Sequence, residues 1–229
     1  MNNTLIEKIQ RKAHKWVSPN ADRFLSSVKG VIHVGANAGQ EKENYQKRKI
    51  KVIWIEPIPH VFKALRANIQ DAPDQKAYQY LITDVDNREY TFHIANNFGA
   101  SSSILELADH KKIWPDVDFE QSIKLKSITL TRMVDREKIN MENYDALVLD
   151  TQGSELLVLK GAVPLLSNFK YIKTEAPDFE AYSNCCKLKE LSDFLKTYHF
   201  KECRRCKFAK HKSAGSYYDV VFKKVRATA

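Results

Sequence analysis

The sequence predicts an α/β fold in which a mostly parallel central sheet has helices on both faces and an antiparallel pair at one edge. Gly30–Val34 and Lys51–Ile55 are apolar on both faces, as is typical of parallel strands covered by helices. A helical segment at residues 40–48 lies between them, so the three segments form a βαβ unit. Residues 200–207 and 216–224 have the pattern of two paired strands, which predicts the antiparallel edge.

The chain length favours one domain. Its 229 residues are enough to bury a core of their own, with little length for a second domain. We expect the domain to cover residues 30–229, after a helical extension over residues 1–29. In that extension, an amphipathic helix at residues 3–16 is expected to pack its apolar stripe on the domain, and a short helix at residues 21–28 leads into the first strand.

The middle of the chain departs from simple βα alternation. Residues 90–94 and 122–130 alternate like strands, and a long loop over residues 96–115 lies between them. We expect a β-excursion between the third and fourth parallel strands, and its apolar content indicates a packed, functional loop. The other expected elements are parallel strands at residues 78–82, 144–150 and 171–174, and helices at residues 60–69, 130–139, 155–160 and 188–198.

Charge and hydropathy limit the possible partners. No apolar run is long enough to span a membrane, and residues 1–15 are charged throughout, which predicts a soluble cytoplasmic protein. The net charge of +9 leaves nucleic acid possible, but the basic residues are spread over the chain, so nucleic acid is not favoured. The cysteines at 185, 186, 203 and 206 fit free thiols better than a zinc site, and no metal is expected.

The turn after the first strand is the first candidate ligand site. Gly35 and Gly39 would let a ligand approach the backbone, and Glu56 follows at the offset where a carboxylate binds a ribose diol. The turn lacks the third glycine of a dinucleotide motif, and Glu41 in the following helical turn would repel a pyrophosphate. The pattern therefore favours S-adenosylmethionine (SAM), which carries a ribose and a positive sulfonium but no phosphate.

Carboxylates follow the other expected parallel strands. Asp84, Asp150 and Glu175 stand near the ends of the third, fourth and fifth strands, at the edge where open α/β sheets bind ligands. Asp84 could accept a hydrogen bond from an adenine amino group, or it could be an ordinary turn residue.

Several segments resemble the FkbM family of SAM-dependent methyltransferases. They are residues 31–41, the Glu56–Pro57 pair, the serines at 101–103, and residues 147–155 with 159–162. The resemblance implies a Rossmann-like class I methyltransferase fold and, commonly, O-methylation of sugars or glycosylated molecules. His33 stands where the family usually has Asp, so Glu41 or a backbone contact would have to replace that acid. The candidate cofactor-binding residues are His33, Gly35, Ala36, Asn37, Gly39, Glu41, Glu56, Pro57, Asp84, Ser102 and Asp150.

Methyl transfer to a sugar hydroxyl needs a base, because the hydroxyl is a weak acid. Asp150 is the first candidate, followed by Glu175 and His110. Each has a plainer alternative: Asp150 could cap the next helix, Glu175 could be a turn acid, and His110 could be a solvated surface histidine. His33 could likewise be a hydrogen-bonded core residue.

Three functions remain open at this point. The first is an O-methyltransferase that uses SAM and acts on a sugar or glycan acceptor. The second is an RNA methyltransferase, which the charge of +9 would suit. The third is a binding module with a degenerate cofactor site, suggested by His33.

Overall fold

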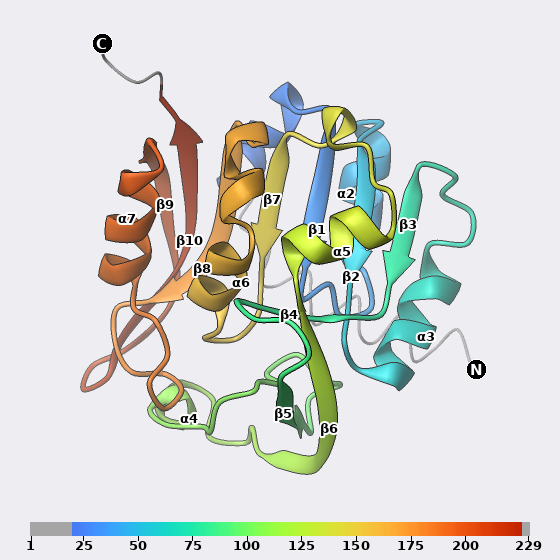
Figure 1. The fold of residues 1–229 in the computed structure, drawn as a ribbon. Helices are drawn as coiled ribbons and strands as arrows, with labels where there is room; N and C mark the ends of the chain where they lie inside the picture. The colour runs from blue at the N-terminus through green and yellow to red at the C-terminus, as the bar shows by residue number, and fades with distance from the viewer. Residues whose placement is uncertain (1–19, 226–229) are drawn as a thin grey trace.

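The computed structural model describes residues 20–225 and contains a seven-stranded central sheet (Figure 1). Its strand order is β3-β2-β1-β7-β8-β10-β9, with the first five parallel and β10 antiparallel to both of its neighbours. The mostly parallel sheet with an antiparallel edge pair is thus confirmed. The strands are β1 (Gly30–Val34), β2 (Lys51–Ile55), β3 (Gln75–Tyr78), β7 (Ala146–Leu149), β8 (Tyr171–Pro177), β9 (Phe200–His211) and β10 (Gly215–Lys224).

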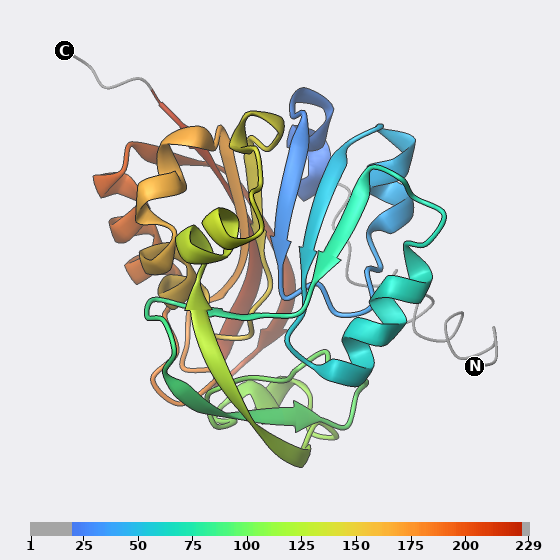
Figure 2. The same ribbon diagram turned by 45° about the vertical axis from the view of Figure 1, so that its right-hand side comes forward.

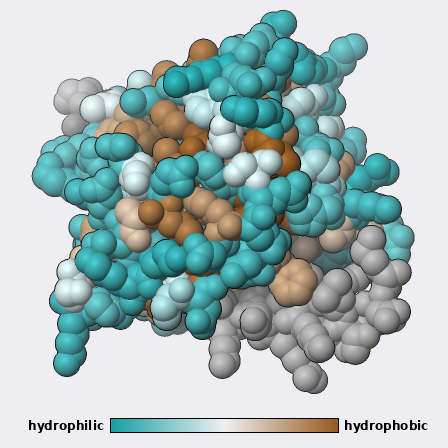
Figure 3. Space-filling model, turned by 90° about the horizontal axis from the view of Figure 1, so that it is seen from below, coloured by the Kyte–Doolittle hydropathy of each residue, from teal (hydrophilic) through white to brown (hydrophobic). Residues whose placement is uncertain are grey.

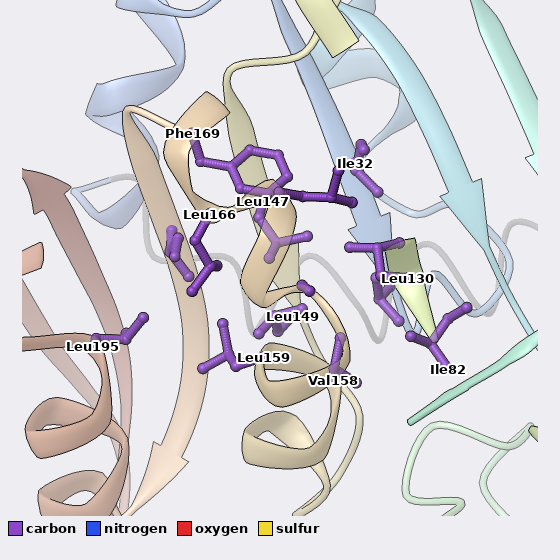
Figure 4. Packing of buried hydrophobic residues seen from close by; sticks show 14 of the residues in the cluster. Ile32, Ile82, Leu130, Leu147, Leu149, Val158, Leu159, Leu166, Phe169 and Leu195 are labelled. Atoms are coloured by element: carbon purple, nitrogen blue, oxygen red, sulfur yellow. The ribbon is translucent and has the colours of Figure 1, made fainter. Parts of the chain in front are cut away.

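Helices cover both faces of this sheet. On one face, α5 (Leu130–Arg136), α6 (Glu155–Gly161), the 3-10 helix η3 (Val163–Asn168) and α7 (Leu188–Thr197) bury apolar residues against the sheet (Figure 4). On the other face lie the 3-10 helix η1 (Ala21–Ser27), α2 (Lys42–Lys47) and α3 (Pro59–Asn68). Because both faces are buried, β1 has no exposed residue, as its unbroken apolar run predicts.

A second sheet interrupts the α/β alternation, where the β-excursion is expected. Its order is β4-β6-β5, with β4 (Leu81–Thr83) parallel to β6 (Phe119–Thr129) and β5 (Glu89–Ala95) antiparallel to it. The short helix α4 (His110–Ile113) lies in the loop between β5 and β6, and the 3-10 helix η2 (Met141–Asn143) precedes β7. In Figure 2 the strands β5 and β6 lie below the carboxyl ends of the central strands.

The expected third strand at residues 78–82 is wrong. The main-sheet strand β3 ends at Tyr78, and the chain then crosses to the second sheet, where β4 begins at Leu81. Both short strands are partly apolar, so the sequence shows a single apolar segment. In the structure, β3 and β4 pair with strands of different sheets.

The N-terminal part is only partly described. The expected amphipathic helix at residues 3–16 lies outside the described residues. The next segment is the 3-10 helix η1, and it packs Phe24 and Leu25 into the core beside α2 and α3. None of the helices in residues 20–225 has the length and apolar composition needed to cross a membrane.

Candidate active site at the carboxyl edge

The turn after β1 is tied to the end of β2 by its backbone. The amides of Gly35 and Ala36 both donate to the carbonyl of Ile55, at 3.0 Å each. Gly35 has φ +80°, and a Cβ atom on it would lie 1.8 Å from the carbonyl oxygen of Asp150. A Cβ on Gly39 would lie 2.7 Å from Cδ1 of Leu65. The chain itself therefore fills the space on the Cβ side of both glycines, and their contact with a ligand stays a prediction.

Glu56 follows β2 directly and is only 4% exposed. Its Oε2 accepts from the amide of Asn37 at 2.8 Å, and its Oε1 accepts from the amide of Ile58 at 2.9 Å. Burial raises the pKa of this carboxyl to about 7, although both backbone hydrogen bonds act to lower it. A carboxylate has about four acceptor positions, so roughly two remain for further hydrogen bonds. Pro57 follows it and is partly buried.

His33 is a buried residue of the core, in agreement with the alternative that it is a hydrogen-bonded core histidine. Its ring is 4% exposed, stacks on Trp54 with ring centroids 5.1 Å apart, and has Nδ1 3.3 Å from the hydroxyl of Tyr45. Burial lowers its pKa to about 3, helped by the charge of Lys173, so the ring is neutral at pH 7. Glu41 stands at the start of α2, partly buried, and burial raises its pKa.

Asp150 is the first residue after β7, beside the turn. Its amide donates to the carbonyl of Val34 at 3.0 Å, and its Oδ1 accepts from Nε2 of Gln152 at 2.6 Å. Burial raises its pKa to about 7 despite that hydrogen bond, with further contributions from Glu155 and Glu41. Asp150 does not cap α6: the carboxylate of Glu155 accepts from the amides of Thr151 and Gly153 instead, at 2.9 to 3.2 Å.

Glu175 lies inside β8, not at its tip. Antiparallel pairing with β10 continues to Pro177, which extends β8 beyond the expected end at Thr174. Glu175 stands opposite Asp219 of β10, and burial, Asp150 and Asp219 raise its pKa well above the usual range. The plainer alternative of an ordinary turn acid is therefore wrong.

Lys173 is a partly buried cation beside these acids, and the sequence pattern did not indicate it as a site residue. Its Nζ lies 2.8 Å from Oδ1 of Asp22 and 3.7 Å from Oδ1 of Asp219. Burial lowers its pKa, but the two carboxylates outweigh burial and leave the pKa raised. Lys173 stays protonated and offsets part of the negative charge of the acids around it.

Asp84 lies apart from the acids at the carboxyl edge of the central sheet. It follows β4 of the second sheet and is exposed. The carbonyl of its neighbour Thr83 abuts Gly161, the last residue of α6, at the opposite end of that helix from the turn at Asp150. The expectation that Asp84 ends the third parallel strand is wrong, and its position fits the alternative of a turn residue.

The loop of the β-excursion contacts the turn and the end of β7. Asn37 Nδ2 donates to the carbonyl of Phe98 at 3.0 Å, and Ser103 Oγ donates to the carbonyl of Gln152 at 2.8 Å. Ser102 is buried and accepts from the amide of Ala95 at 3.0 Å, so its hydroxyl is engaged within the loop. This loop therefore covers part of the edge, and Figure 3 shows apolar side chains in the middle of a mostly hydrophilic surface there.

His110 is buried and not on the surface, so its alternative as a solvated histidine is wrong. It is 2% exposed, its Nδ1 lies 2.8 Å from the hydroxyl of Tyr217, and its Nε2 lies 3.2 Å from Oγ of Ser101. Its ring packs against Trp114 and Tyr182, with centroids 4.5 and 5.0 Å away. Burial lowers its pKa to about 4.

A pocket lies between the end of β7 and the β8–β10 pair. Two carboxylates, an amide and two phenols line it, and neither Lys nor Arg does. No sequence pattern indicates Tyr182 or Tyr217 as a site residue, because each lies in a segment whose pattern is typical of ordinary packing. The lining residues are Gln152, Gly153, Glu155, Glu175, Pro177, Tyr182 and Tyr217.

Comparison with known proteins identifies the family. The sequence profile of the methyltransferase FkbM domain matches residues 33–208, which is most of the chain. The chain belongs to this family. Its FkbM domain makes it a SAM-dependent methyltransferase, as the resemblance of its motifs implied.

One curated relative is the 2-O-methyltransferase NoeI of Sinorhizobium fredii. It is 25% identical over 178 residues, covering 73% of this chain and 71% of NoeI.

Solved structures share the fold at low sequence identity. The METTL16 MTase domain superposes with a TM-score of 0.52 at 8% identity, covering 90% of this chain and 65% of that one. An uncharacterised protein from Listeria monocytogenes superposes with a TM-score of 0.51 at 8% identity, covering 93% and 70%. These likenesses confirm the expected class I methyltransferase fold and carry no information on the substrate.

The four cysteines are free thiols in the structure. Among the described residues there is no group of three or more His, Cys, Asp or Glu side chains placed to hold a metal ion.

Proposed function

We propose that the protein transfers the methyl group of SAM to a hydroxyl of a sugar or glycan. The observation that carries the proposal is the set of acids at the carboxyl edge: Glu56 follows β2, Asp150 follows β7 and Glu175 lies in β8, beside a small hollow with amide and phenol groups in its lining. Groups of this kind suit the hydroxyls of a sugar. The similarity to a 2-O-methyltransferase supports the same class of reaction.

The residues of the turn fit the cofactor. Glu56 keeps free acceptor positions beside Asn37, as a ribose diol requires, and Glu41 and Asp150 supply negative charge near it, as a sulfonium requires. When bound, SAM supplies an activated methyl group: the acceptor oxygen bonds the carbon while the carbon–sulfur bond breaks and its electron pair returns to sulfur.

The chain then has two tasks, alignment and proton removal. Asp150 stands between the turn and the pocket, because its backbone packs on Gly35 and its side chain binds Gln152 of the pocket wall. With a pKa of about 7 it is about half ionised at neutral pH, which suits a general base that takes the hydroxyl proton. Glu175 is the second candidate base, because it lines the pocket itself.

Calorimetry with S-adenosylhomocysteine (SAH) and assays with labelled SAM test the proposal. We expect the wild type to bind SAH, and Asp150→Asn to lower kcat by roughly 10²-fold or more while SAH binding changes little. Glu175→Gln is the matched variant, and a larger loss for it would make Glu175 the base. The proposal fails if no SAH binds at millimolar concentration or if labelled methyl reaches no hydroxylated sugar.

The RNA alternative rests on the net charge of +9. Exposed lysines and arginines of β9, such as Arg205 and Lys207, could contact phosphates, but the pocket lining has no cation for a phosphate next to the reacting group. Salt-dependent retention on RNA together with methyl incorporation would select this alternative. Turnover of any sugar acceptor would exclude the non-catalytic alternative.

A further inference from the structure

Phe98 is an aromatic residue at the carboxyl edge that the roles above leave unused. Among residues 20–225, the exposed large apolar side chains are Phe98, at 47%, and Val85, at 39%. Single exposed apolar residues are common on protein surfaces and need no special explanation. What distinguishes Phe98 is the conformation of its backbone and its position beside the turn after β1.

The backbone of Phe98 has a conformation that is unfavourable for a bulky residue. Its φ is +60°, in the left-handed region that favours glycine, and Gly99 follows with φ +77°. Non-glycine residues persist in this region where the surrounding contacts impose it, and they gather at functional sites. A glycine at position 98 would form the same turn without strain, so the turn itself does not require the phenyl ring.

The turn that carries Phe98 is fixed by hydrogen bonds on both of its sides. The amide of Gly99 donates to the carbonyl of Ala95 at 3.1 Å. The side chain of Asn97 bonds Ser101 twice, because its Nδ2 donates to Oγ at 2.9 Å and its Oδ1 accepts from the amide at 3.1 Å. The ring of Phe98 is therefore presented from a rigid support, which lowers the entropy cost of binding a ligand.

Further contacts place this turn beside Glu56. The carbonyl of Phe98 accepts from Nδ2 of Asn37 at 3.0 Å, and the amide of Asn37 donates to Oε2 of Glu56 at 2.8 Å. A Cβ atom on Gly99 would lie 3.0 Å from Cδ1 of Ile58, at the start of α3. Asn37 therefore links the backbone of Phe98 to the carboxylate that is proposed to bind the ribose.

The strand order shows on which side of the cofactor site Phe98 stands. Strands β2, β1 and β7 are neighbours in that order, so Glu56 after β2 and Asp150 after β7 lie on opposite sides of the turn after β1. The base and the sulfur of SAM leave its ribose in opposite directions. With the ribose at Glu56 and the sulfonium toward Asp150, the base lies on the β2 side. Phe98 is on that side, because its turn contacts Asn37 and the start of α3.

We infer that Phe98 is a cofactor-binding residue whose ring stacks on the adenine of SAM. Adenine is flat, aromatic and uncharged, and an exposed phenyl ring that is already held in place suits such a base. The inference rests on the proposed function and deepens it, because it assigns a residue of the β-excursion to the cofactor. Ser103, farther along the same loop, bonds Gln152 on the β7 side, so the loop extends across the edge from the base toward the methyl group.

Calorimetry with SAH tests the inference through three substitutions of Phe98. Removal of a stacking partner lowers affinity by roughly 5- to 100-fold, so the Kd of SAH should rise by that factor for Phe98→Ala. Phe98→Leu keeps apolar surface without an aromatic face and should give a smaller rise, and Phe98→Trp should stay within about threefold of the wild type. Val85→Ala is the matched control, because Val85 is exposed but lies beside Asp84, away from this edge, and it should change Kd by less than about twofold.

Two further measurements separate stacking from a structural role. In Phe98→Trp, SAH should quench the fluorescence of the added indole beyond any change seen with the wild type. Phe98→Gly removes the ring and relieves the backbone strain, so its urea midpoint should be no lower than that of the wild type, while its SAH affinity falls as far as that of Phe98→Ala. A lower urea midpoint for Phe98→Gly with unchanged SAH affinity would assign the ring to packing and overturn the inference.

The inference is also overturned if Phe98→Ala binds SAH within about twofold of the wild type. If that variant instead raises the KM of the acceptor, Phe98 contacts the acceptor and not the base. In both cases the wild type still binds SAH, so the proposed function stands without the inference. A wild type that binds no SAH contradicts the proposed function at its cofactor, and the inference with it.

Discussion

The two halves of the candidate site are built differently. The cofactor half, from β1 to Glu56, is one continuous segment, and backbone amides fix its main carboxylate. The acceptor half gathers Gln152, Glu175, Tyr182 and Tyr217 from four separate segments, and His110 supports it from a fifth. Backbone contacts constrain the first half, whereas side-chain contacts across long sequence separations constrain the second.

This difference indicates which half of the site can change its ligand specificity. A substitution in the first half disturbs main-chain hydrogen bonds and therefore the binding of any cofactor. The second half can exchange single side chains while the strands that carry them stay in place. We therefore expect mutations in the two halves to affect different measured quantities.

The largest expected effect is on the cofactor half. Glu56→Gln replaces an acceptor-only carboxylate with an amide, and a hydrogen bond to a charged group contributes about 1.5–3 kcal/mol, so SAH affinity should fall roughly 10- to 100-fold. Calorimetry measures the loss, and Glu43→Gln, an exposed acid of α2, is the control. Equal SAH affinity for Glu56→Gln and wild type would remove Glu56 from the site.

A smaller effect on cofactor affinity is expected from a change of pH. It involves both Glu56 and Asp150. Asp150 and Glu56 have pKa values raised to about 7, so both ionise between pH 6 and pH 8. The cation SAM should gain affinity over this range more than the neutral thioether SAH, with the ratio of their Kd values changing by up to about tenfold per proton released. A ratio that does not change with pH would show that neither carboxylate senses the sulfonium.

The same two groups act on the stability of the ligand-free protein. Each acid has a folded-state pKa above its unfolded value, so the folded state binds more protons between about pH 4.5 and pH 7. Their contribution to the free energy of unfolding is present at low pH and is lost as the pH rises through about 7. Asp150→Asn should weaken the pH dependence of the free energy of unfolding, measured by chemical denaturation.

The smallest expected effect is at the contact between the excursion loop and the acceptor half. Ser103→Ala removes the bond to the carbonyl of Gln152 and the bond that its Oγ accepts from the amide of Leu105, which together should cost about 1–3 kcal/mol in the free energy of unfolding. Urea denaturation measures it, with exposed Ser167→Ala as the control. A loss no larger than that of Ser167→Ala would show that the loop is not anchored by this bond.

The sequence predicts the first half better than the second for a physical reason. The βαβ unit and Glu56 depend on local patterns, and both lie where these patterns place them. The third strand is misplaced, because its residues divide between two sheets whose partners are distant in the chain. His110 looks exposed beside Lys111 and Lys112, since its partner Tyr217 is 107 residues away.

The position of Glu175 is likewise beyond prediction from the local sequence. Its carboxylate is evident in the sequence, but the length of β8 depends on β10, so its position inside the strand cannot be read from local residues. Tyr217 alternates in a strand like any buried aromatic residue, and only the fold shows that it faces a pocket.

The close approach of Gly35 to Asp150 sets a limit on motion in this enzyme. With the carbonyl of Asp150 occupying the position where a Cβ of residue 35 would stand, the end of β7 and the turn after β1 form one incompressible unit. The β-excursion adds to this unit, because hydrogen bonds at Asn37, at Ser103 and between His110 and Tyr217 tie its loop to the turn, to the end of β7 and to β10.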